Sequence, residues 1–276
     1  MKKWILVLLT SLLAAGCTGK FVYDNLDWLV IDYLEDFVEL NDEQELALSD
    51  KIATLSSWHR EQEVPKYVQH IDQLLRVEPA SFSLQDLKSQ QTLFQQHGQR
   101  LLNQIEPNIF DLATLLSDEQ TEELMNSIRV RHTKYKKKYQ KLDDEEIREN
   151  YAERIEESFE NWLGSLERSQ KQLVSEWTKE LYITSYDWIE HQTKMRIELK
   201  TLLAKRASAS VFNKSLQPLL FNPTSFYSDE LNRKVEHNKA VGDRYTVAII
   251  NSMTEKQTRH FREELQDWRD IADDLL

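Results

Sequence analysis

The chain has 276 residues, 40% of them hydrophobic, and a formal net charge of −12 at pH 7. Seven Trp, ten Tyr and ten Phe give it enough apolar bulk for a globular core. The acidic balance argues against binding to nucleic acid, whose phosphates are neutralised by clustered Lys and Arg, and against electrostatic docking on anionic lipid headgroups. Because the chain has one cysteine, it forms no intrachain disulfide, and its stability must come from burial.

Residues 1–16 have the order of a secretion signal. The basic pair Lys2-Lys3 precedes an apolar run, and Ala14-Ala15-Gly16 leads into Cys17. The run is shorter than the roughly 20 residues of a permanent membrane span, and the order of basic, apolar and small residues is typical of a removable signal. We expect residues 1–16 to be cleaved, which removes two lysines and no acid and brings the net charge to −14.

The residues around Cys17 resemble the lipobox of bacterial lipoproteins, although Ala14 stands where that motif usually has leucine. The resemblance implies cleavage between Gly16 and Cys17, a diacylglyceryl thioether on the sulfur, and acylation of the amine by a fatty acid such as palmitate. Several acyl chains, at about 0.8 kcal/mol per buried CH₂, anchor a protein firmly. Thr18 replaces the aspartate that retains lipoproteins at the inner membrane, so we expect the periplasmic face of the outer membrane. The alternatives are a secreted protein with a free cysteine and a cytosolic protein with an apolar N-terminus.

The low content of Gly and Pro, five of each, predicts a helical protein. Hairpin turns use both residues, whereas helix interiors exclude them. No segment shows the sustained alternation of a strand. We predict an all-α fold with a single multi-helix domain and long antiparallel helical hairpins over residues 23–276, preceded by a lipidated N-terminus and tether at residues 17–22.

Taken along the chain, apolar residues recur at steps of three and four from Val22 to Leu40, which predicts one helix. The next distinctive segment is Trp58-His59-Arg60-Glu61, followed by Pro65. Since proline cannot donate the helical bond to residue 61, we expect a kinked helix there. A recognition surface built on the Trp, His and Arg is the alternative.

A basic stretch from Arg129 to Lys141 is followed directly by an acidic one from Asp143 to Glu160. A chain reversal near Leu142 would pair the two as an antiparallel hairpin and would place base at a helix C-terminus and acid at an N-terminus, as helix dipoles favour. One unbroken helix through Leu142, and a polyanion-binding basic patch, are the alternatives.

Beyond Gly164-Ser165, apolar residues from Leu166 to Leu202 predict a helix of roughly 40 residues, with Trp177 and Trp188 in the core rather than in a carbohydrate platform. Residues 207–228 are interrupted by Ser, Asn and Pro and predict a packed loop with a short helical turn. Further helices are predicted at 229–239, 243–252 and 254–276.

An apolar residue followed four places later by glutamine occurs four times, ending at Gln44, Gln120, Gln170 and Gln257. In three of the copies, Asn41, Ser117 or Thr254 is an N-cap residue with Gln at N3, which is a capping box. In the remaining copy, which ends at Gln170, Ser165 is the candidate N-cap. These segments resemble the Leu-Thr-x-x-Gln motif of Spy- and CpxP-type periplasmic proteins, which are all-helical and include ATP-independent chaperones.

A wider resemblance rests on segments spread along the chain: Tyr23 to Trp28, Trp58 to Arg60, Val64 to Tyr67, the Leu116 segment, and Gly164 to Gln170. Together they are similar to an uncharacterised, unknown-function family of helical lipoproteins from Gram-negative bacteria. The resemblance implies a helical lipoprotein and transfers no catalytic residue.

No motif with catalytic or cofactor chemistry is present in the sequence. The seven histidines form no zinc-protease motif, and a lone cysteine rules out thiolate metal sites. A site made by His59 and Glu63, one helical turn apart, is the one metal-binding pair to consider. The isolated glycines form no phosphate loop, and there is no G-x-S-x-G elbow. We therefore predict no catalytic residue, no cofactor, no metal and no implied small-molecule ligand.

The expected function is that of a non-enzymatic interaction or structural lipoprotein of the envelope. Its partners would be the membrane, through the lipid on Cys17, and a periplasmic or outer-membrane protein, with no nucleic acid. A chaperone-like binder of unfolded clients is the first alternative, and a peptidoglycan-active hydrolase is the second.

Overall fold

The computed structural model describes residues 18–276, which form helices and no strands. This confirms the all-α fold. The predicted cleavage and lipid-attachment residues, Gly16 and Cys17, lie outside the described residues. The α-helices are α2 (Thr18–Asp24), α3 (Leu26–Glu35), α4 (Asp42–Trp58), α5 (Val64–Leu74), α6 (Leu84–Leu115), α7 (Asp118–Tyr139), α8 (Asp144–Leu163), α9 (Arg168–Glu180), α10 (Ser185–Leu203), α11 (Ala209–Phe221), α12 (Asp229–Asn251) and α13 (Glu255–Asp273). A π-helix, η1 (His59–Glu63), and two 3₁₀ turns, η2 (Pro79–Ser81) and η3 (Pro223–Phe226), complete the described chain.

The described chain divides into two compact units. The first contains residues 18–77 and 262–276, and the second contains residues 78–261. The second boundary falls inside α13, after Phe261. The sequence predicted one domain over residues 23–276, whereas the structure has two units, each with its own packed residues.

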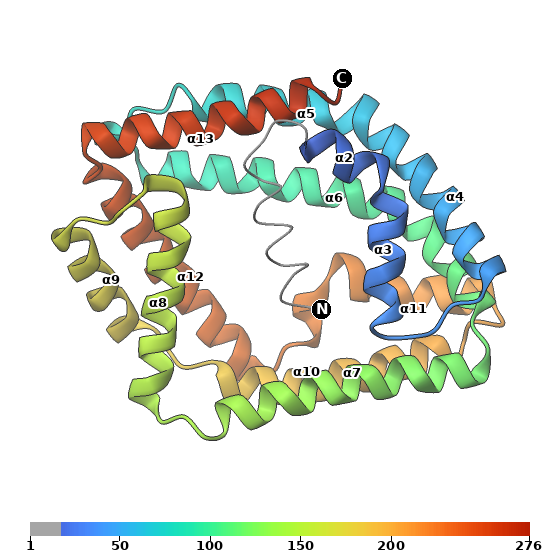
Figure 1. Ribbon diagram of the computed structural model, residues 1–276. Helices are drawn as coiled ribbons and strands as arrows, with labels where there is room; N and C mark the ends of the chain where they lie inside the picture. The colour runs from blue at the N-terminus through green and yellow to red at the C-terminus, as the bar shows by residue number, and fades with distance from the viewer. Residues whose placement is uncertain (1–17) are drawn as a thin grey trace. The chain divides into compact units, whose positions relative to one another are not determined.

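In the first unit, α3 and α4 pack side by side and run in opposite directions (Figure 1). Helix α4 continues through the π-helix η1 into α5. Val64 at the start of α5 packs with Ala272 and Leu275 near the C-terminus, with Tyr23 against them. The predicted kink before Pro65 takes the form of this π-helix, whose wider turn leaves the proline ring room at the second position of α5.

In the second unit the helices pack as antiparallel pairs. Helix α7 lies along α10, α8 along α9, α9 along α12, and α6 along α11 (Figure 1). The α8–α9 hairpin turns at Gly164, whose φ of +73° is accessible to glycine because it has no Cβ. Two clusters of buried residues hold these pairs together: Leu163, Leu166, Val174 and Ile249 in one, and Ala113, Leu202, Leu203, Phe212 and Leu216 in the other. Full burial of one such large side chain is worth about 1.5–3 kcal/mol.

The reversal predicted near Leu142 is present, but the charge pairing drawn from it is wrong. Helix α7 ends at Tyr139 and α8 begins at Asp144, yet α7 packs on α10 and α8 packs on α9. Acidic residues still open α8 and lysines still close α7, as the helix dipoles favour. The apolar faces of the two helices therefore select partners later in the chain, and the acidic residues Glu156 and Glu160 of α8 pair with Lys171 on α9 rather than with the lysines of α7.

Two predicted helices are divided in the structure. The helix expected over Val22–Leu40 is interrupted at Asn25, which stands before the first residue of α3 without a side-chain capping bond, and α3 ends at Glu35. The prediction of a helix of roughly 40 residues from Leu166 is wrong, because residues 181–184, between α9 and α10, are not helical. The side chains that hold this second break open come from α8 and α12.

Two other predictions are wrong in the opposite direction. Most of the loop expected at 207–228 is the helix α11, with Phe212 and Leu216 buried. Helix α12 runs without a break through Gly242, where two helices were expected. An added Cβ at Gly242 would lie 3.1 Å from Trp177 Cζ2, so this glycine is where α9 and α12 approach closely. The final predicted helix is present as α13.

The recurring glutamine motif starts helices as predicted, and two of its copies also meet. Asn41, Ser117 and Thr254 form capping boxes with their glutamines, whereas Glu167 rather than Ser165 is the N-cap of α9. The amides of Gln170 and Gln257, 0% and 3% exposed, donate to each other's oxygens at 3.0 and 2.7 Å. The motif thus supplies a buried polar link between α9 and α13 in the second unit.

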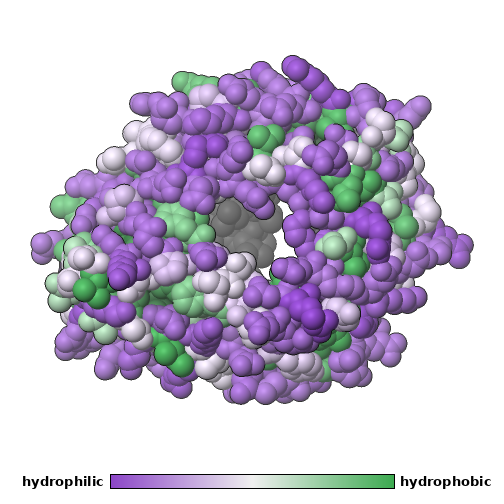
Figure 2. All heavy atoms as spheres, turned by 180° about the vertical axis from the view of Figure 1, so that it is seen from behind, coloured by the Kyte–Doolittle hydropathy of each residue, from purple (hydrophilic) through white to green (hydrophobic). Residues whose placement is uncertain are grey.

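The face of the molecule in Figure 2 is mainly hydrophilic, with hydrophobic side chains in small separate groups. Residues 18–276 contain no helix with the length and apolar composition that a bilayer span requires.

Candidate functional site

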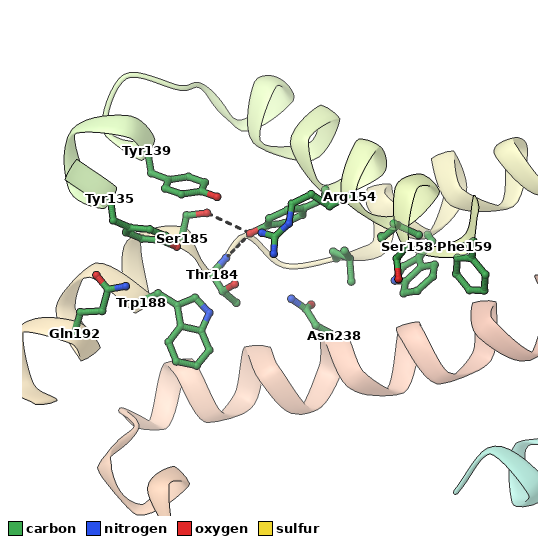
Figure 3. A pocket seen from close by; sticks show the side chains of 14 residues that line it. Tyr135, Tyr139, Arg154, Ser158, Phe159, Thr184, Ser185, Trp188, Gln192 and Asn238 are labelled. Carbon is green, nitrogen blue, oxygen red and sulfur yellow. Dashed lines mark hydrogen bonds between the residues drawn. The ribbon is translucent and has the colours of Figure 1, made fainter. Parts of the chain in front are cut away.

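A cavity of about 780 Å³ lies in the second unit where α7, α8 and the α9–α10 connection meet α12. This volume is within the roughly 300–1,000 Å³ of known ligand sites. Rings form much of its wall, and polar side chains lie between them (Figure 3). The lining residues are Tyr135, Tyr139, Tyr151, Arg154, Ile155, Ser158, Phe159, Trp177, Leu181, Thr184, Ser185, Trp188, Gln192 and Asn238.

The break between α9 and α10 gives the cavity its shape. The Arg148 guanidinium, on α8, donates to the backbone carbonyls of Thr178 and, at 2.8 Å, of Leu181. The side chain of Asn238, on α12, accepts from the Tyr182 N–H and donates to the Tyr182 carbonyl, both at 2.8 Å. Carbonyls at the end of α9 and the peptide groups beyond it are thereby satisfied outside a helix.

The same break places small polar residues at the cavity wall. The hydroxyl of Tyr151 bonds to the Ser185 hydroxyl at 3.3 Å and accepts from the Thr184 N–H at 3.4 Å (Figure 3). Ser185 is 2% exposed and opens α10. Trp188, in the first turn of α10, consequently faces the cavity rather than continuing the stripe of α9.

Each tryptophan of the wall is fixed by neighbouring rings. The Trp177 ring is parallel to that of Tyr245 at 6.1 Å between centroids and meets Phe159 edge-on at 6.4 Å. Trp188 meets Tyr227 edge-on at 5.2 Å and His191 at 5.4 Å. These separations are in the favourable range for aromatic pairs. The rings are therefore preorganised surfaces and do not need to be ordered by a ligand.

Several polar groups at the cavity have no hydrogen-bond partner among the described residues. They are the hydroxyls of Tyr135, Tyr139 and Ser158, the indole N–H groups of Trp177 and Trp188, the amide of Gln192 and the guanidinium of Arg154. Figure 3 shows Arg154 between Tyr139 and Ser158, with Trp188 and Gln192 at the other end of the cavity. Arg154 is the one charged residue among the described lining residues, and no carboxylate lies with it there.

Burial raises the pKa of Tyr135 to about 12, with further increases from Tyr139 and Tyr151 and an opposing effect of Arg154. The Tyr135 hydroxyl is protonated at neutral pH, as an ordinary tyrosine is, and can donate a hydrogen bond. The Tyr135 and Tyr139 rings lie 4.5 Å apart, so their hydroxyls come from one compact pair on α7.

The other cluster that the sequence singled out lies in the first unit, around the π-helix. The imidazole of His59 bonds to the hydroxyls of Tyr23 and, at 2.9 Å, Tyr67. Glu63 is fully buried and accepts from Lys66 Nζ at 2.7 Å. Burial lowers the pKa of His59 and raises that of Tyr23 to about 12. These groups are bonded to one another.

The pair His59 and Glu63, considered above as metal ligands, therefore has other partners. Within residues 18–276 no three His, Cys, Asp or Glu side chains are grouped so that they could hold a metal ion. The lipid-attachment residue predicted at Cys17 is not among the described residues.

Sequence reasoning missed the cavity. It placed Trp177 and Trp188 in the core, and both do pack against rings, but both also line the cavity wall. One signal was available: Ile183-Thr184-Ser185 interrupts the run of strong helix formers. A break at that point would have separated the two tryptophans onto different helices.

Comparison with known proteins identifies a family without an assigned activity. The model of a family of unknown function, DUF6279, matches residues 36–232. No curated protein and no solved structure matches the chain. The matched range includes every lining residue of the cavity except Asn238. The chain belongs to the DUF6279 family of unknown function.

Proposed function

We propose that this protein is a lipid-anchored envelope lipoprotein that binds a component of the bacterial envelope non-covalently in the aromatic cavity. The observation that carries the proposal is the set of unpaired hydrogen-bonding groups between fixed rings, among them Arg154, Trp188 and Gln192. Polar groups that make no bond inside the protein and face a cavity are available to a ligand, and fixed rings reduce the entropy lost on binding.

The lipid anchor places this binding site at the periplasmic face of the outer membrane. Support comes from residues 1–17 of the sequence, where a basic, apolar and small-residue order ends at the chain's one cysteine. Metabolic labelling with a palmitate analogue checks this part. Cys17→Ser abolishes labelling if the proposal is right, and unchanged labelling contradicts it.

A site-specific photo-crosslinker tests the binding function. We would place p-benzoylphenylalanine at Gln192, which lines the cavity, and at the neighbouring exposed Thr193 as the matched control. Cells are irradiated, and both protein and glycan adducts are identified by mass spectrometry. An adduct that forms from position 192 and not from 193 is expected. Equal adducts at both positions, or none at either, overturn the proposal.

The crosslinking, together with two assays of the purified protein, separates the two alternatives. A chaperone-like binder would yield many unfolded clients, and the purified protein would suppress aggregation of a denatured client at stoichiometric amounts. A peptidoglycan-active hydrolase would release soluble fragments from purified sacculi. The proposed binder yields a single reproducible adduct, no suppression and no release.

A further inference from the structure

We infer that the ligand of the aromatic cavity is a saccharide that carries a carboxylate, held by the guanidinium of Arg154 and stacked on the rings of the wall. This inference rests on the proposed function of the cavity and names the chemistry of its ligand.

The rings account for the saccharide. A pyranose presents a flat apolar face of C–H groups and a rim of hydroxyls, so its site needs both aromatic surfaces and dispersed neutral donors and acceptors. The cavity has both. Trp177 and Trp188 are fixed by neighbouring rings, while Ser158, Gln192 and the Tyr135 hydroxyl offer unpaired polar groups between them.

Arg154 accounts for the carboxylate. Its guanidinium makes no hydrogen bond or ion pair with a described residue, although the chain as a whole has 47 acidic residues. A planar guanidinium binds a carboxylate through two parallel hydrogen bonds. Since no lining residue is acidic, a carboxylate on the ligand meets one positive charge and no negative charge in the cavity.

Other ligand classes fit these observations less well. A phosphate is usually held by several cations or by backbone amides at a helix N-terminus, whereas this wall has one guanidinium. A fatty acyl chain would leave the hydroxyls and amides of the wall unpaired.

Two disaccharides matched in ring number test the inference. The probes are N-acetylglucosaminyl-N-acetylmuramic acid, which carries a lactyl carboxylate, and di-N-acetylchitobiose, which does not. Binding to the purified full-length protein is followed by tryptophan fluorescence and by isothermal titration calorimetry. The acidic disaccharide is expected to bind at least about tenfold more tightly than the neutral one, which is the scale of one charge-assisted hydrogen bond.

Three variants assign the effect to residues. Arg154→Gln is expected to weaken binding of the acidic disaccharide about tenfold and to leave that of the neutral one unchanged. Arg154→Lys should bind the acidic disaccharide more tightly than Arg154→Gln but less tightly than the unchanged protein, because lysine keeps the positive charge and lacks the two parallel donors of the guanidinium. Arg259→Gln, at an exposed arginine of α13 outside the cavity, should change neither.

The outcomes separate this inference from the proposed function. If the two disaccharides bind with equal affinity, or if Arg154→Gln has no effect on binding, the inference that Arg154 binds a carboxylate of the ligand is wrong. If neither disaccharide binds and a protein or lipid is crosslinked at position 192, the inference that the ligand is a saccharide is wrong and the proposed function stands. Failure of both disaccharides and of the crosslink overturns both.

Discussion

The π-helix cluster of the first unit and the aromatic cavity of the second contain similar residue types, but the side chains are hydrogen-bonded to one another in the cluster and several lack a partner at the cavity. Around the π-helix, the His59 ring lies between two tyrosine hydroxyls and Glu63 accepts from Lys66. At the cavity, tyrosine hydroxyls, an amide and an arginine have no partner among the described residues. Tyrosine and charge therefore do not by themselves mark a binding site. The state of pairing distinguishes groups that hold the fold from groups that are available to a ligand.

Two arginines on α8 show the same difference within one helix. Arg148 is half-buried and donates to carbonyls at the end of α9. Arg154, six positions later, is exposed at the cavity and bonds to nothing described. Arg148 should therefore matter for stability and Arg154 for binding, and the two effects can be measured separately.

The largest expected effect concerns the buried glutamine pair, where pairing is complete. Gln170→Leu removes the two buried bonds to the Gln257 amide and the bonds of Gln170 to Ser252 and to the Glu167 N–H, whereas Gln257 keeps its bond to the Ser165 carbonyl. The change should lower the free energy of unfolding by about 2–3 kcal/mol. The double variant Gln170→Leu/Gln257→Leu should cost less than the two single changes together, since each single change already breaks the bonds between the two amides. Urea unfolding measures both.

The control for this pair is Gln120→Leu, at the same position of a capping box but half-exposed. Its cost should stay near or below about 1 kcal/mol. Strict additivity of the Gln170 and Gln257 changes would show that the two amides do not interact.

The next effect is a pH dependence at the paired cluster. Burial lowers the pKa of His59 in the folded protein, so the unfolded chain binds a proton first as pH falls. Stability is full above the ordinary histidine pKa of about 6.5 and decreases below it, by up to about 1.4 kcal/mol per pH unit for one group, until the folded protein is also protonated.

The pKa values of His132 and His191 are lowered by burial as well, so each contributes in the same direction. His59→Gln should therefore reduce the slope of unfolding free energy against pH between 5 and 6.5 without removing it. Chemical denaturation at a series of pH values gives the slope. A slope that His59→Gln leaves unchanged would place this histidine in a solvated environment.

A smaller effect is expected at the cavity wall. Gly242→Ala should gain about 1 kcal/mol in helix propensity, but its methyl group would stand 3.1 Å from Trp177 Cζ2. Because Trp177 is held by Tyr245 and Phe159, we expect overpacking to exceed that gain, with a net loss of about 1 kcal/mol. Gly98→Ala, on α6 with nothing within 4 Å of the new methyl, should instead stabilise the protein. Equal effects of the two substitutions would contradict the close approach at Trp177.

Local signals in the sequence predicted much of the fold. Scarce Gly and Pro predicted the all-α class, and the motifs ending at Gln44, Gln120 and Gln257 predicted helix starts that the structure has as capping boxes. These features depend on neighbouring residues, so a single chain contains the information.

Features that depend on distant residues could not be predicted in this way. The break at residues 181–184 is held by Arg148 and Asn238, which lie more than 30 positions away on each side. The cavity likewise combines residues of α7, α8, α10 and α12. The charge pattern after Arg129 predicted the reversal but chose the wrong packing partner, since apolar contacts with α10 outweigh surface ion pairs.

The most direct test of the account measures stability and binding together in Arg148→Gln and Arg154→Gln. Arg148→Gln is expected to lower the free energy of unfolding by about 2 kcal/mol, because carbonyls at the end of α9 lose their donor. Arg154→Gln should change the free energy of unfolding by less than about 0.5 kcal/mol and should weaken binding of the acidic disaccharide about tenfold. If Arg154→Gln instead lowers stability as Arg148→Gln does and leaves binding unchanged, then Arg154 supports the fold and does not hold the carboxylate of the ligand.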